Sequence, residues 1–395
     1  MRDDPIVIAS AARTPLGSFM GALSAFPAHA LGATAIRAAV ARARLVPDSV
    51  EEVIMGNVLS AGQGQAPARQ AALSAGLPET AGCTTINKVC GSGMKAAMLA
   101  CDSIALGSSS VIVAGGMESM SNAPYLLPKA RSGLRLGHRE LKDHMFVDGL
   151  EDAYDSGRLM GVFAEDCAKH YRFSREAQDR FAISSLTRAQ QATNDGSFEN
   201  ELVPVERAGR TMQELVRHDE QPLKASPDRI PQLKPAFRPD GTVTAANSSS
   251  ISDGAAALVL MKLSDAERRG IAPLARIVGH ATHPQMPQWF TTAPVGAVRR
   301  LFDKTGWDAV NTDLFEINEA FAVVTMAAMQ DLDLPHEKVN VHGGACALGH
   351  PLGASGARIM VTLLGALRKY GLRRGIATLC IGGGEATAIA LERIG

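Results

Sequence analysis

Three short motifs occur twice in this chain, once near its start and once near its end. The pairs are Met55-Gly-Asn with Glu316-Ile-Asn, Cys90-Gly-Ser-Gly-Met-Lys with Gly353-Ala-Ser-Gly-Ala-Arg, and Ala114-Gly-Gly-Met-Glu with Ile381-Gly-Gly-Gly-Glu. They keep the same order and nearly the same spacing, which chance rarely produces, and the period is far longer than that of solenoid repeats. We therefore expect a duplicated unit whose two copies pack face to face around a shared cleft.

Each copy alternates strand and helix signals, which favours α/β layers. Apolar runs bounded by glycine or polar residues are typical of buried strands, and they occur at residues 5–9, 53–58, 111–114 and 376–381. Apolar residues at helical spacing predict a helix over 92–107, with Ser92 placed to cap its start and Gly107 to end it. An equivalent helix is predicted near 357–371.

The segment between the copies differs from them in composition. Arg, Asp, His, Gly and Pro become frequent, and short helices such as 175–190 alternate with loops. Long irregular insertions are commonly functional. We expect an N-terminal half over 1–121 that is completed by 250–272, an inserted loop domain over 122–249, and a C-terminal half over 273–395.

Charge and hydropathy restrict the classes of partner. Lys plus Arg equals Asp plus Glu at 40 each, so no net field draws the chain to nucleic acid or to an anionic membrane. The N-terminal sequence lacks the basic region and apolar stretch of a signal peptide, and we expect no membrane-spanning segment. Any anionic ligand must be held by local groups.

Cysteine usage favours a reducing compartment, which for this chain means the cytoplasm. Six irregularly spaced cysteines in 395 residues do not make a disulfide framework. The sequence has no CxxC pair and no HExxH motif, so we expect no metal site.

Cys90 is the cysteine whose surroundings best suit a nucleophile. It lies in Asn87-Lys-Val-Cys-Gly-Ser-Gly, between a predicted strand and the start of the predicted helix. Unpaired amides and the helix dipole should lower the pKa of its thiol, and the flanking glycines leave space for a carbonyl. The remaining cysteines are better explained as small buried residues, with one exception treated below.

His350 lies in a glycine-dense loop that leads into the second predicted helix, Gly343-Gly-Ala-Cys-Ala-Leu-Gly-His-Pro-Leu-Gly. Histidine is the side chain best suited to proton exchange near neutral pH. Such a histidine can also simply bond to neighbouring carbonyls, and we prefer that explanation for His29, His138 and His283.

Two further strand ends carry candidate polar groups. Cys380 ends an apolar strand and precedes Ile381-Gly-Gly-Gly, where successive amides can form an oxyanion hole. Asn318, at the end of another strand, could position water or a carbonyl. Taken singly, a core cysteine and a turn-forming asparagine would explain both residues.

Taken together, these segments resemble the thiolase family along the whole length of the chain. The motifs are NKVCGSGMKA, NEAFA, GGACALGHPLGASGAR and CIGGG, in this order, with further similarity at Ala114-Gly-Gly-Met-Glu-Ser-Met-Ser and at Thr242-Val-Thr-Ala-Ala-Asn-Ser. The resemblance implies the thiolase fold, in which duplicated βαβ-type halves form five layers, α-β-α-β-α, and an inserted loop domain covers coenzyme A (CoA). It also implies a homotetramer.

The resemblance also implies roles for the candidate residues. Cys90 would carry the acyl group, His350 would be the base that activates the Cys90 thiol, and Cys380 would be the acid/base for the α-carbon. One oxyanion hole would use the amides of Cys90 and Gly382, and the other His350 with a water held by Asn318. The reaction would be the condensation of two acetyl-CoA to acetoacetyl-CoA and CoA, or its reversal, with no cofactor and CoA thioesters as substrates.

Further residues would contact the substrate by the same resemblance. Ser249 would bond the pantetheine arm and Arg217 would lie near the adenine nucleotide, while Ala320 and Phe321 would line the acyl pocket. The remaining expected CoA contacts are Met160, Phe237 and Ala245. Leu159 occupies a position where bacterial biosynthetic relatives have a histidine.

Three alternatives remain open at this point. The nearest is a degradative thiolase that prefers longer 3-oxoacyl chains, although the stretch 87–124 looks more like short-chain acetoacetyl-CoA thiolases. A cysteine hydrolase using Cys90 and His350 would leave the second glycine-flanked cysteine unexplained. A catalytically inactive CoA-binding subunit would have no need of all four reactive residues.

Overall fold

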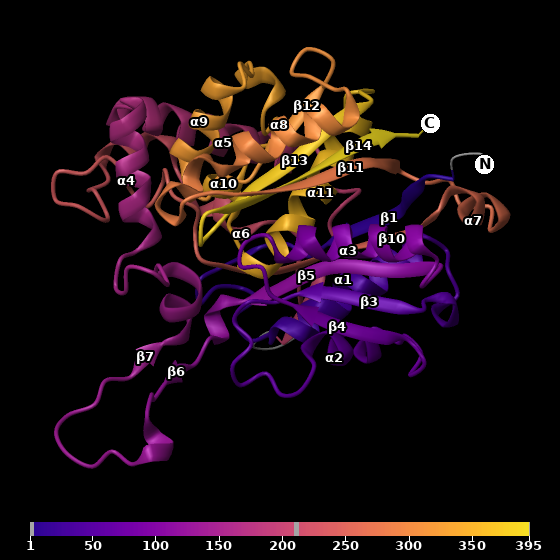
Figure 1. The fold of residues 1–395 in the computed structure, drawn as a ribbon, viewed down its shortest axis with the longest axis horizontal. Coiled ribbons are helices and arrows are strands. Elements are labelled where there is room, and N and C mark those ends of the chain that lie inside the picture. Colours follow the sequence, from indigo (N-terminus) through magenta and orange to yellow (C-terminus); the bar gives the residue numbers. More distant parts are fainter. Residues whose placement is uncertain (1–3, 209–212, 395) are drawn as a thin grey trace.

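Two sheet halves, each covered by helices on both faces, form the body of the protein (Figure 1). The structure is a computed structural model that describes residues 4–208 and 213–394. Strands of the first half follow the order β4-β3-β5-β10-β1. Their bounds are β1 (Ile6–Arg13), β3 (Glu52–Gly56), β4 (Gly82–Ile86), β5 (Val111–Ser119) and β10 (Ser252–Lys262), and the short β2 (Gly17–Ser18) pairs with β10.

The second half repeats this order, as the duplicated motifs predict. Its strands run β12-β13-β14-β11 and comprise β11 (Ala275–Pro284), β12 (Leu314–Ile317), β13 (Arg374–Ile381) and β14 (Glu385–Arg393). In each half the pairing of β3 with β5, or of β12 with β13, is parallel, and the next two pairings are antiparallel. A parallel bridge from Phe315 to Val339 occupies the place of β4.

A short pairing between β1 and β11 joins the halves into one sheet. It consists of Val7 opposite Arg276 and Ile8 opposite Ala275. The helices of the first half are α1 (Ala28–Arg42), α2 (Pro67–Ser74), α3 (Ser92–Leu106) and α7 (Leu263–Arg268). Those of the second half are α8 (Ala293–Thr305), α9 (Ala322–Asp331), α10 (Ala345–Leu348) and α11 (Leu352–Lys369).

Alternation along the strands separates three hydrophobic cores and so creates five layers. On β10, Leu258 and Leu260 face the central core with α3 and α11, whereas Val259 and Met261 face the outer core with α1 and α2. On β14, Ile389 and Leu391 join the central core, and the alternate residues face α8. The order α1/α2, sheet, α3/α11, sheet, α8/α9 is the expected α-β-α-β-α arrangement.

Glycine backbones bring the two central helices into direct contact. A Cβ on Gly356 would lie 2.4 Å from the backbone nitrogen of Met94, and one on Gly93 would lie 2.8 Å from the nitrogen of Ala357. A Cβ on Gly116 of β5 would lie 1.9 Å from the carbonyl oxygen of Gly353. These positions therefore hold the start of α11 against the first half of the molecule.

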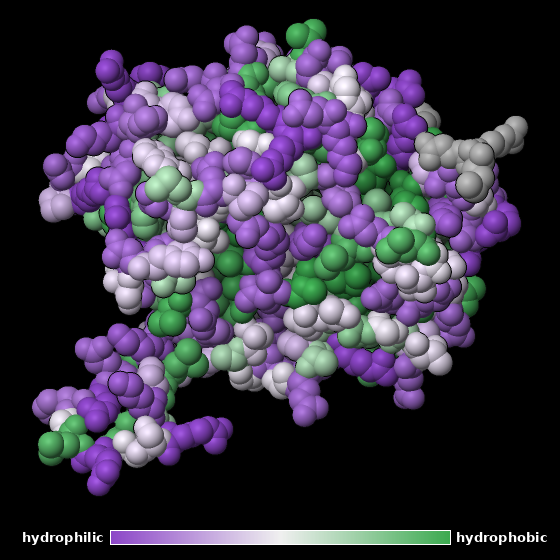
Figure 2. Space-filling model, viewed as in Figure 1, coloured by the Kyte–Doolittle hydropathy of each residue, from purple (hydrophilic) through white to green (hydrophobic). Residues whose placement is uncertain are grey.

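The inserted segment lies over one edge of this body. Its elements are β6 (Tyr125–Leu126), β7 (Lys142–Asp143), a π-helix (Phe146–Leu150), α4 (Met160–Tyr171), α5 (Arg175–Asn194), β8 (Val205–Ala208), β9 (Gln213–Val216) and α6 (Glu220–Lys224). The β6–β7 hairpin projects as an arm from the body, and Figure 2 shows hydrophobic side chains among the polar ones on it. Large exposed apolar residues on the arm are Tyr125, Leu127, Leu134, Leu136 and Leu141.

Two details of α3 differ from the sequence-based expectation. Ser92 is the first helical residue and not the cap: its hydroxyl accepts the N–H of Lys88 at 2.8 Å and donates to the carbonyl of Val89 at 2.6 Å, so it stabilises the preceding turn. The segment Val89–Leu106 is also long and apolar enough to cross a membrane, which the sequence-based expectation did not include. It is the buried central helix of the fold.

The central helix contact predicts the effect of one substitution. In a helix interior, Gly→Ala ordinarily gains up to about 1 kcal/mol. For Gly356→Ala we expect the clash with the Met94 backbone to outweigh this gain and to lower the free energy of unfolding by about 1–3 kcal/mol, measured by urea denaturation. Gly82→Ala is the control, because the nearest atom to its Cβ is 3.8 Å away. Equal stability of the two variants would contradict the role of this contact.

Candidate active site

A cavity of about 440 Å³ brings together residues from both halves and from the insertion. Four of the predicted catalytic residues line it, Cys90 from the first half and His350, Cys380 and Gly382 from the second. The cavity is within the size range of small-molecule sites, and its walls are mostly apolar. Among the cavities of the described residues, it is the one in which two thiols and an imidazole meet.

Cys90 is held on a tight turn between β4 and α3. Val89, immediately before it, has a left-handed backbone with φ +46°, a conformation that is strained for a β-branched residue. The Asn87 side chain accepts the N–H of Val89 at 2.9 Å, and the Ser92 hydroxyl holds the other side of the turn. A Cβ on Gly91 would lie 2.4 Å from the Ile381 side chain, so this glycine lets the second half approach the nucleophile.

The pKa of Cys90 differs from the expectation of a lowered value. Burial raises the pKa of the thiol to about 11, although the N–H groups of Gly382 and of Cys90 itself donate to the sulfur and act in the opposite direction. The residue is only 9% exposed, and removal of a thiolate from water outweighs two backbone donors. The free site therefore holds a neutral thiol, with two amides from different halves converging on its sulfur.

His350 is oriented by a hydroxyl on the next helix. Its Nδ1 lies 2.5 Å from Ser355 Oγ, which donates its own proton to the Pro351 carbonyl at 2.9 Å. The hydroxyl must then accept from His350, so this network assigns the proton to Nδ1. Nε2 is buried and has no hydrogen-bond partner among the described residues. Burial, with the charge of Arg358, lowers the pKa of His350 to about 3, which leaves a neutral imidazole with a free acceptor.

Cys380 lies at the end of β13 beside a glycine turn. Burial raises its pKa well above the usual value, and the charge of the nearby Cys90 acts in the same direction. Gly383 and Gly384 have φ of +92° and +88°, which glycine adopts without strain. This turn leads the chain back into β14 and leaves Gly382 pointing its N–H at the sulfur of Cys90.

Asn318 lies behind His350 and is not among the residues that line the cavity. Its side-chain nitrogen is 3.5 Å from His350 Nδ1, and its oxygen is 3.4 Å from a guanidinium nitrogen of Arg358. Arg358 also forms a buried ion pair with Glu316 at 3.1 Å. Burial nevertheless raises the pKa of Glu316 to about 8. The His350 imidazole is therefore backed by a buried polar network of Asn318, Arg358 and Glu316.

The predicted substrate contacts divide into two groups. Most of them line the same cavity as the catalytic candidates: Met160, Phe237, Ala245, Ser249, Ala320 and Phe321. The segment around Ser249 runs beside the one around Ala320, since the N–H of Ser249 donates to the Ala320 carbonyl at 2.9 Å. Leu159, the departure from relatives, adds an apolar side chain to the wall.

Arg217 is the exception. It is exposed after β9 and lines a separate cavity of about 350 Å³ with Phe198, His218 and Asp219. Gln221, four residues further on, lines the catalytic cavity. Residues 217–221 therefore contribute to two cavities, and Arg217 belongs to the one without a cysteine.

The sequence reading missed several residues of the site. Ser355 orients His350 and lies within the quoted motif Gly353-Ala-Ser-Gly, but nothing in the pattern indicated that its hydroxyl faces the imidazole. Other unpredicted lining residues, which are apolar and lie far apart in the sequence, are Phe146, Leu150, Ile251, Phe290 and Leu352. Periodicity indicates that such residues are buried but does not indicate which cavity they line.

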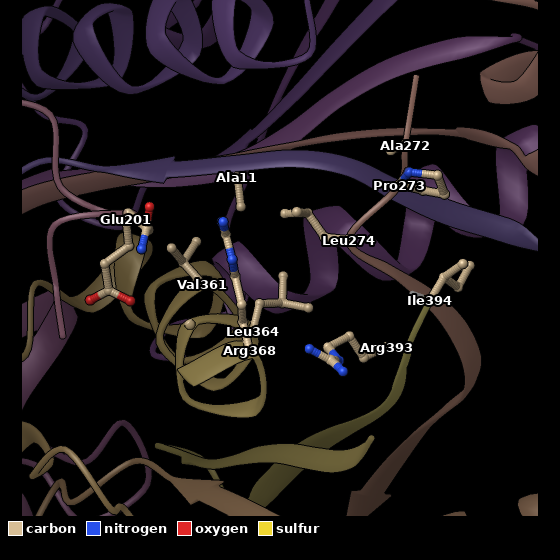
Figure 3. Close-up of a pocket in the computed structure, with 12 residues that line it drawn as sticks. Ala11, Glu201, Ala272, Pro273, Leu274, Val361, Leu364, Arg368, Arg393 and Ile394 are labelled. Carbon is tan, nitrogen blue, oxygen red and sulfur yellow. The ribbon is translucent and has the colours of Figure 1, made fainter. Parts of the chain in front are cut away.

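A further cavity, of about 250 Å³, lies between β1, α11 and the last strand (Figure 3). Among the described residues that line it, the polar ones are Asn200, Glu201, Arg368 and Arg393, and none is a cysteine or a histidine. It therefore lacks the thiols and the imidazole that meet in the larger cavity. Within residues 4–208 and 213–394, no group of three or more His, Cys, Asp or Glu side chains is arranged to hold a metal ion.

Comparison with known proteins supports the assignment that this geometry suggests. The models of the thiolase N-terminal and C-terminal domains match residues 6–264 and 271–393. A probable acetyl-CoA acetyltransferase of Dictyostelium discoideum is 50% identical over 99% of this chain and 94% of its own length. The cytosolic acetyl-CoA acetyltransferase of Mus musculus is 49% identical over 99% of this chain and 98% of its own.

A solved structure agrees with these sequence matches. The crystal structure of a thiolase from Ascaris suum in complex with coenzyme A superposes with a TM-score of 0.93 at 42% identity, covering 99% of this chain and all of the other. Both halves and the insertion between them are thus matched over nearly the full length. The chain belongs to the thiolase family.

Proposed function

We propose that this chain is an acetyl-CoA C-acetyltransferase, which condenses two acetyl-CoA to acetoacetyl-CoA and CoA and catalyses the reverse thiolysis. The observation that carries the proposal is the convergence of Cys90, Cys380 and a neutral His350 on one cavity, with two amides at the Cys90 sulfur. Relatives about half identical over their full length carry the name acetyl-CoA acetyltransferase. The chemistry requires a nucleophile and a separate base, and the cavity offers both.

The first half-reaction transfers an acetyl group to Cys90. His350 Nε2 accepts the thiol proton as the sulfur attacks the thioester carbonyl. The oxyanion forms on the carbon that is now bonded to the Cys90 sulfur, and the N–H groups of Cys90 and Gly382, which converge on that sulfur in the free site, would stabilise it. CoA leaves with the proton of Cys380, so the enzyme now holds an acetylated Cys90, a Cys380 thiolate and a protonated His350.

The second half-reaction forms the carbon–carbon bond. The Cys380 thiolate removes an α-proton from a second acetyl-CoA, and its raised pKa makes it a strong enough base for this weak carbon acid. His350, with a water held by Asn318, stabilises the enolate oxygen in this proposal. The enolate attacks the acetyl group, the Cys90 sulfur leaves and recovers its proton from His350, and the site returns to its starting state.

The walls of the cavity support a short acyl chain. Phe237, Phe290 and Phe321 line it together with Met160, and Phe237 packs edge-to-face on Phe321 with ring centroids 6.0 Å apart. Phe321, which the resemblance assigns to the acyl pocket, is thus packed against Phe237, and its ring would leave less space for a longer 3-oxoacyl chain. A degradative thiolase with longer-chain preference is the alternative.

We also propose the setting in which the enzyme works. CoA would lie under the inserted segment, where Ser249, Met160, Phe237 and Ala245 line the cavity. The Ascaris suum thiolase was solved in complex with coenzyme A, which supports CoA as the ligand. The exposed leucines of the β6–β7 arm support a homo-oligomer, for which a tetramer is the expectation. The cytosolic name of the mouse relative supports the cytoplasm as the compartment.

Mass spectrometry after brief incubation with acetyl-CoA tests the role of each thiol. We expect an acetyl group on Cys90 in the wild type and none in Cys90→Ala. Cys380→Ala should be acetylated more slowly, because CoA no longer leaves with the Cys380 proton, but the acetyl group should still be found on Cys90. The variant should condense about 10²- to 10⁴-fold more slowly, because it also lacks the base for the α-carbon. Acetylation at another residue would contradict the proposal. A cysteine hydrolase would release acetate without returning label to CoA, and an inactive subunit would take up no acetyl group.

The protonation state of Cys90 gives a second prediction. Burial raises its pKa to about 11 and lowers that of His350 to about 3, so both should be neutral in the free enzyme. We expect no thiolate absorbance in the ultraviolet that depends on Cys90 between about pH 5 and 9. The measurement is the difference in absorbance between wild type and Cys90→Ala as pH rises. A titration step near neutral pH in the wild type alone would show a preformed thiolate instead.

Chain length gives a third prediction. We expect kcat/KM for thiolysis of acetoacetyl-CoA to exceed that for a 3-oxo-C10 substrate by about tenfold or more, because the aromatic wall limits the acyl pocket. Steady-state kinetics with both substrates at one CoA concentration would measure it. A clear preference for the longer substrate would favour the degradative alternative.

A further inference from the structure

An ion pair between Lys88 and Glu385 joins the two halves beside the catalytic cavity. Lys88 Nζ bonds Glu385 Oε2, and the side chains are 22% and 35% exposed. Lys88 precedes Cys90 by two residues on the turn before α3, and Glu385 begins β14 directly after the glycine turn that contains Gly382. Neither residue lines the cavity. Any effect of the pair on the reaction must therefore be transmitted by these two segments.

The same two segments carry the amides that converge on the Cys90 sulfur. One donor belongs to Cys90 in the first half and the other to Gly382 in the second. The separation of the two N–H groups therefore depends on how closely the turn before α3 sits on the turn after β13. An oxyanion hole works only when both donors lie at hydrogen-bond distance from the same oxygen.

Glu385 is well placed to be the fixed partner. Its backbone pairs with Ile381 of β13 and with Pro284 of β11, so it belongs to the sheet. Lys88, by contrast, lies on a turn that contains the strained Val89 at φ +46°. A strained backbone persists when its surroundings hold it, and the pair links this turn to the sheet of the other half.

The other contacts between the turn before α3 and the second half are mainly apolar. A Cβ on Gly91 would meet the Ile381 side chain, and one on Gly382 would lie 3.8 Å from a Val89 methyl. Such contacts favour proximity of the two segments but do not set the orientation of a backbone N–H, since apolar burial is non-directional. The ion pair is directional and lies on the same short stretch of each segment.

We propose that Lys88 and Glu385 are positioning residues that hold the two halves of the Cys90–Gly382 oxyanion hole at their working separation. The inference rests on the proposed acetyl transfer through Cys90. A partly exposed ion pair contributes little to the stability of the fold. Small displacements of catalytic groups are nevertheless costly in rate. Loss of the pair should therefore slow acetylation by about three- to tenfold and leave the KM for acetyl-CoA nearly unchanged.

A different role for Lys88 makes an opposite prediction. If its ammonium bound a phosphate of CoA, Lys88→Met would raise KM, Glu385→Gln would have no such effect, and a glutamate at position 88 would repel the substrate. The positioning role requires instead that the two single variants behave alike and that their effects not add.

The experiment is a double-mutant cycle with a charge swap. Lys88→Met, Glu385→Gln, the double neutral variant and Lys88→Glu/Glu385→Lys are compared with wild type for the rate of Cys90 acetylation, KM for acetyl-CoA and Tm. Lys369→Met/Asp195→Asn is the matched control, because this Lys–Asp pair is 2.6 Å long, is 32% and 38% exposed, and also joins distant parts of the chain. It lies outside the catalytic cavity.

We expect each single variant and the double neutral variant to slow acetylation by about the same factor, and the swap to recover most of the rate, while the control stays near wild type. Additive losses, an effect of Lys88→Met alone, or a change confined to KM would overturn the inference. If the Tm measurement shows that the charge-swap variant does not fold, the two single variants and the double neutral variant still test whether the effects add. Absence of acetylation in the wild type would instead refute the proposed function.

Discussion

The close contact between the two halves through glycine backbones is the constraint on which the rest of the molecule depends. Gly93 and Gly356 let α3 and α11 touch, and Gly116 lets the carbonyl of Gly353 lie against β5. Because the turns that carry Cys90 and His350 immediately precede these two helices, the helix contact fixes the distance between nucleophile and base. A larger residue at the contact would separate the halves and would open the cavity.

Buried charges reinforce this contact. Glu118 of β5 accepts the N–H of Gly353 at 2.8 Å and that of Val58 at 3.0 Å, so one carboxylate spans both halves. Burial raises its pKa to about 7 despite these bonds. A buried group of this kind adds little net stability, but each donor left unpaired would be destabilising, which favours a single relative placement of the halves.

The sequence predicted the fold class and the duplication, and it singled out the two cysteines and the histidine that the structure brings to one cavity, because these features depend on periodicity and on short local motifs. Apolar runs located β5 and β13, and the glycines that follow Cys90 and Cys380 indicated strand ends open to a ligand. The failures have two causes. The pKa of Cys90 depends on burial between the two halves, which no local pattern encodes. The roles of Ser92 and Ser355 depend on the exact course of a short turn, because Ser92 bonds Lys88 and Val89 of its own turn and Ser355 faces a histidine five residues before it.

The duplication also explains why the two halves contribute different chemistry. The motif around Cys90 aligns with Gly353, so the second half has no sulfur at the equivalent helix start, and its histidine lies in the loop just before it. Ile381 aligns with Ala114, which places the counterpart of Cys380 in the buried strand β5. An equivalent scaffold thus presents a nucleophile from one copy and two proton-transfer groups from the other. Two identical copies would place the same side chains on both sides of the cavity. Because the copies have diverged, one cavity can hold a nucleophilic thiol, an imidazole base and a second thiol with separate tasks.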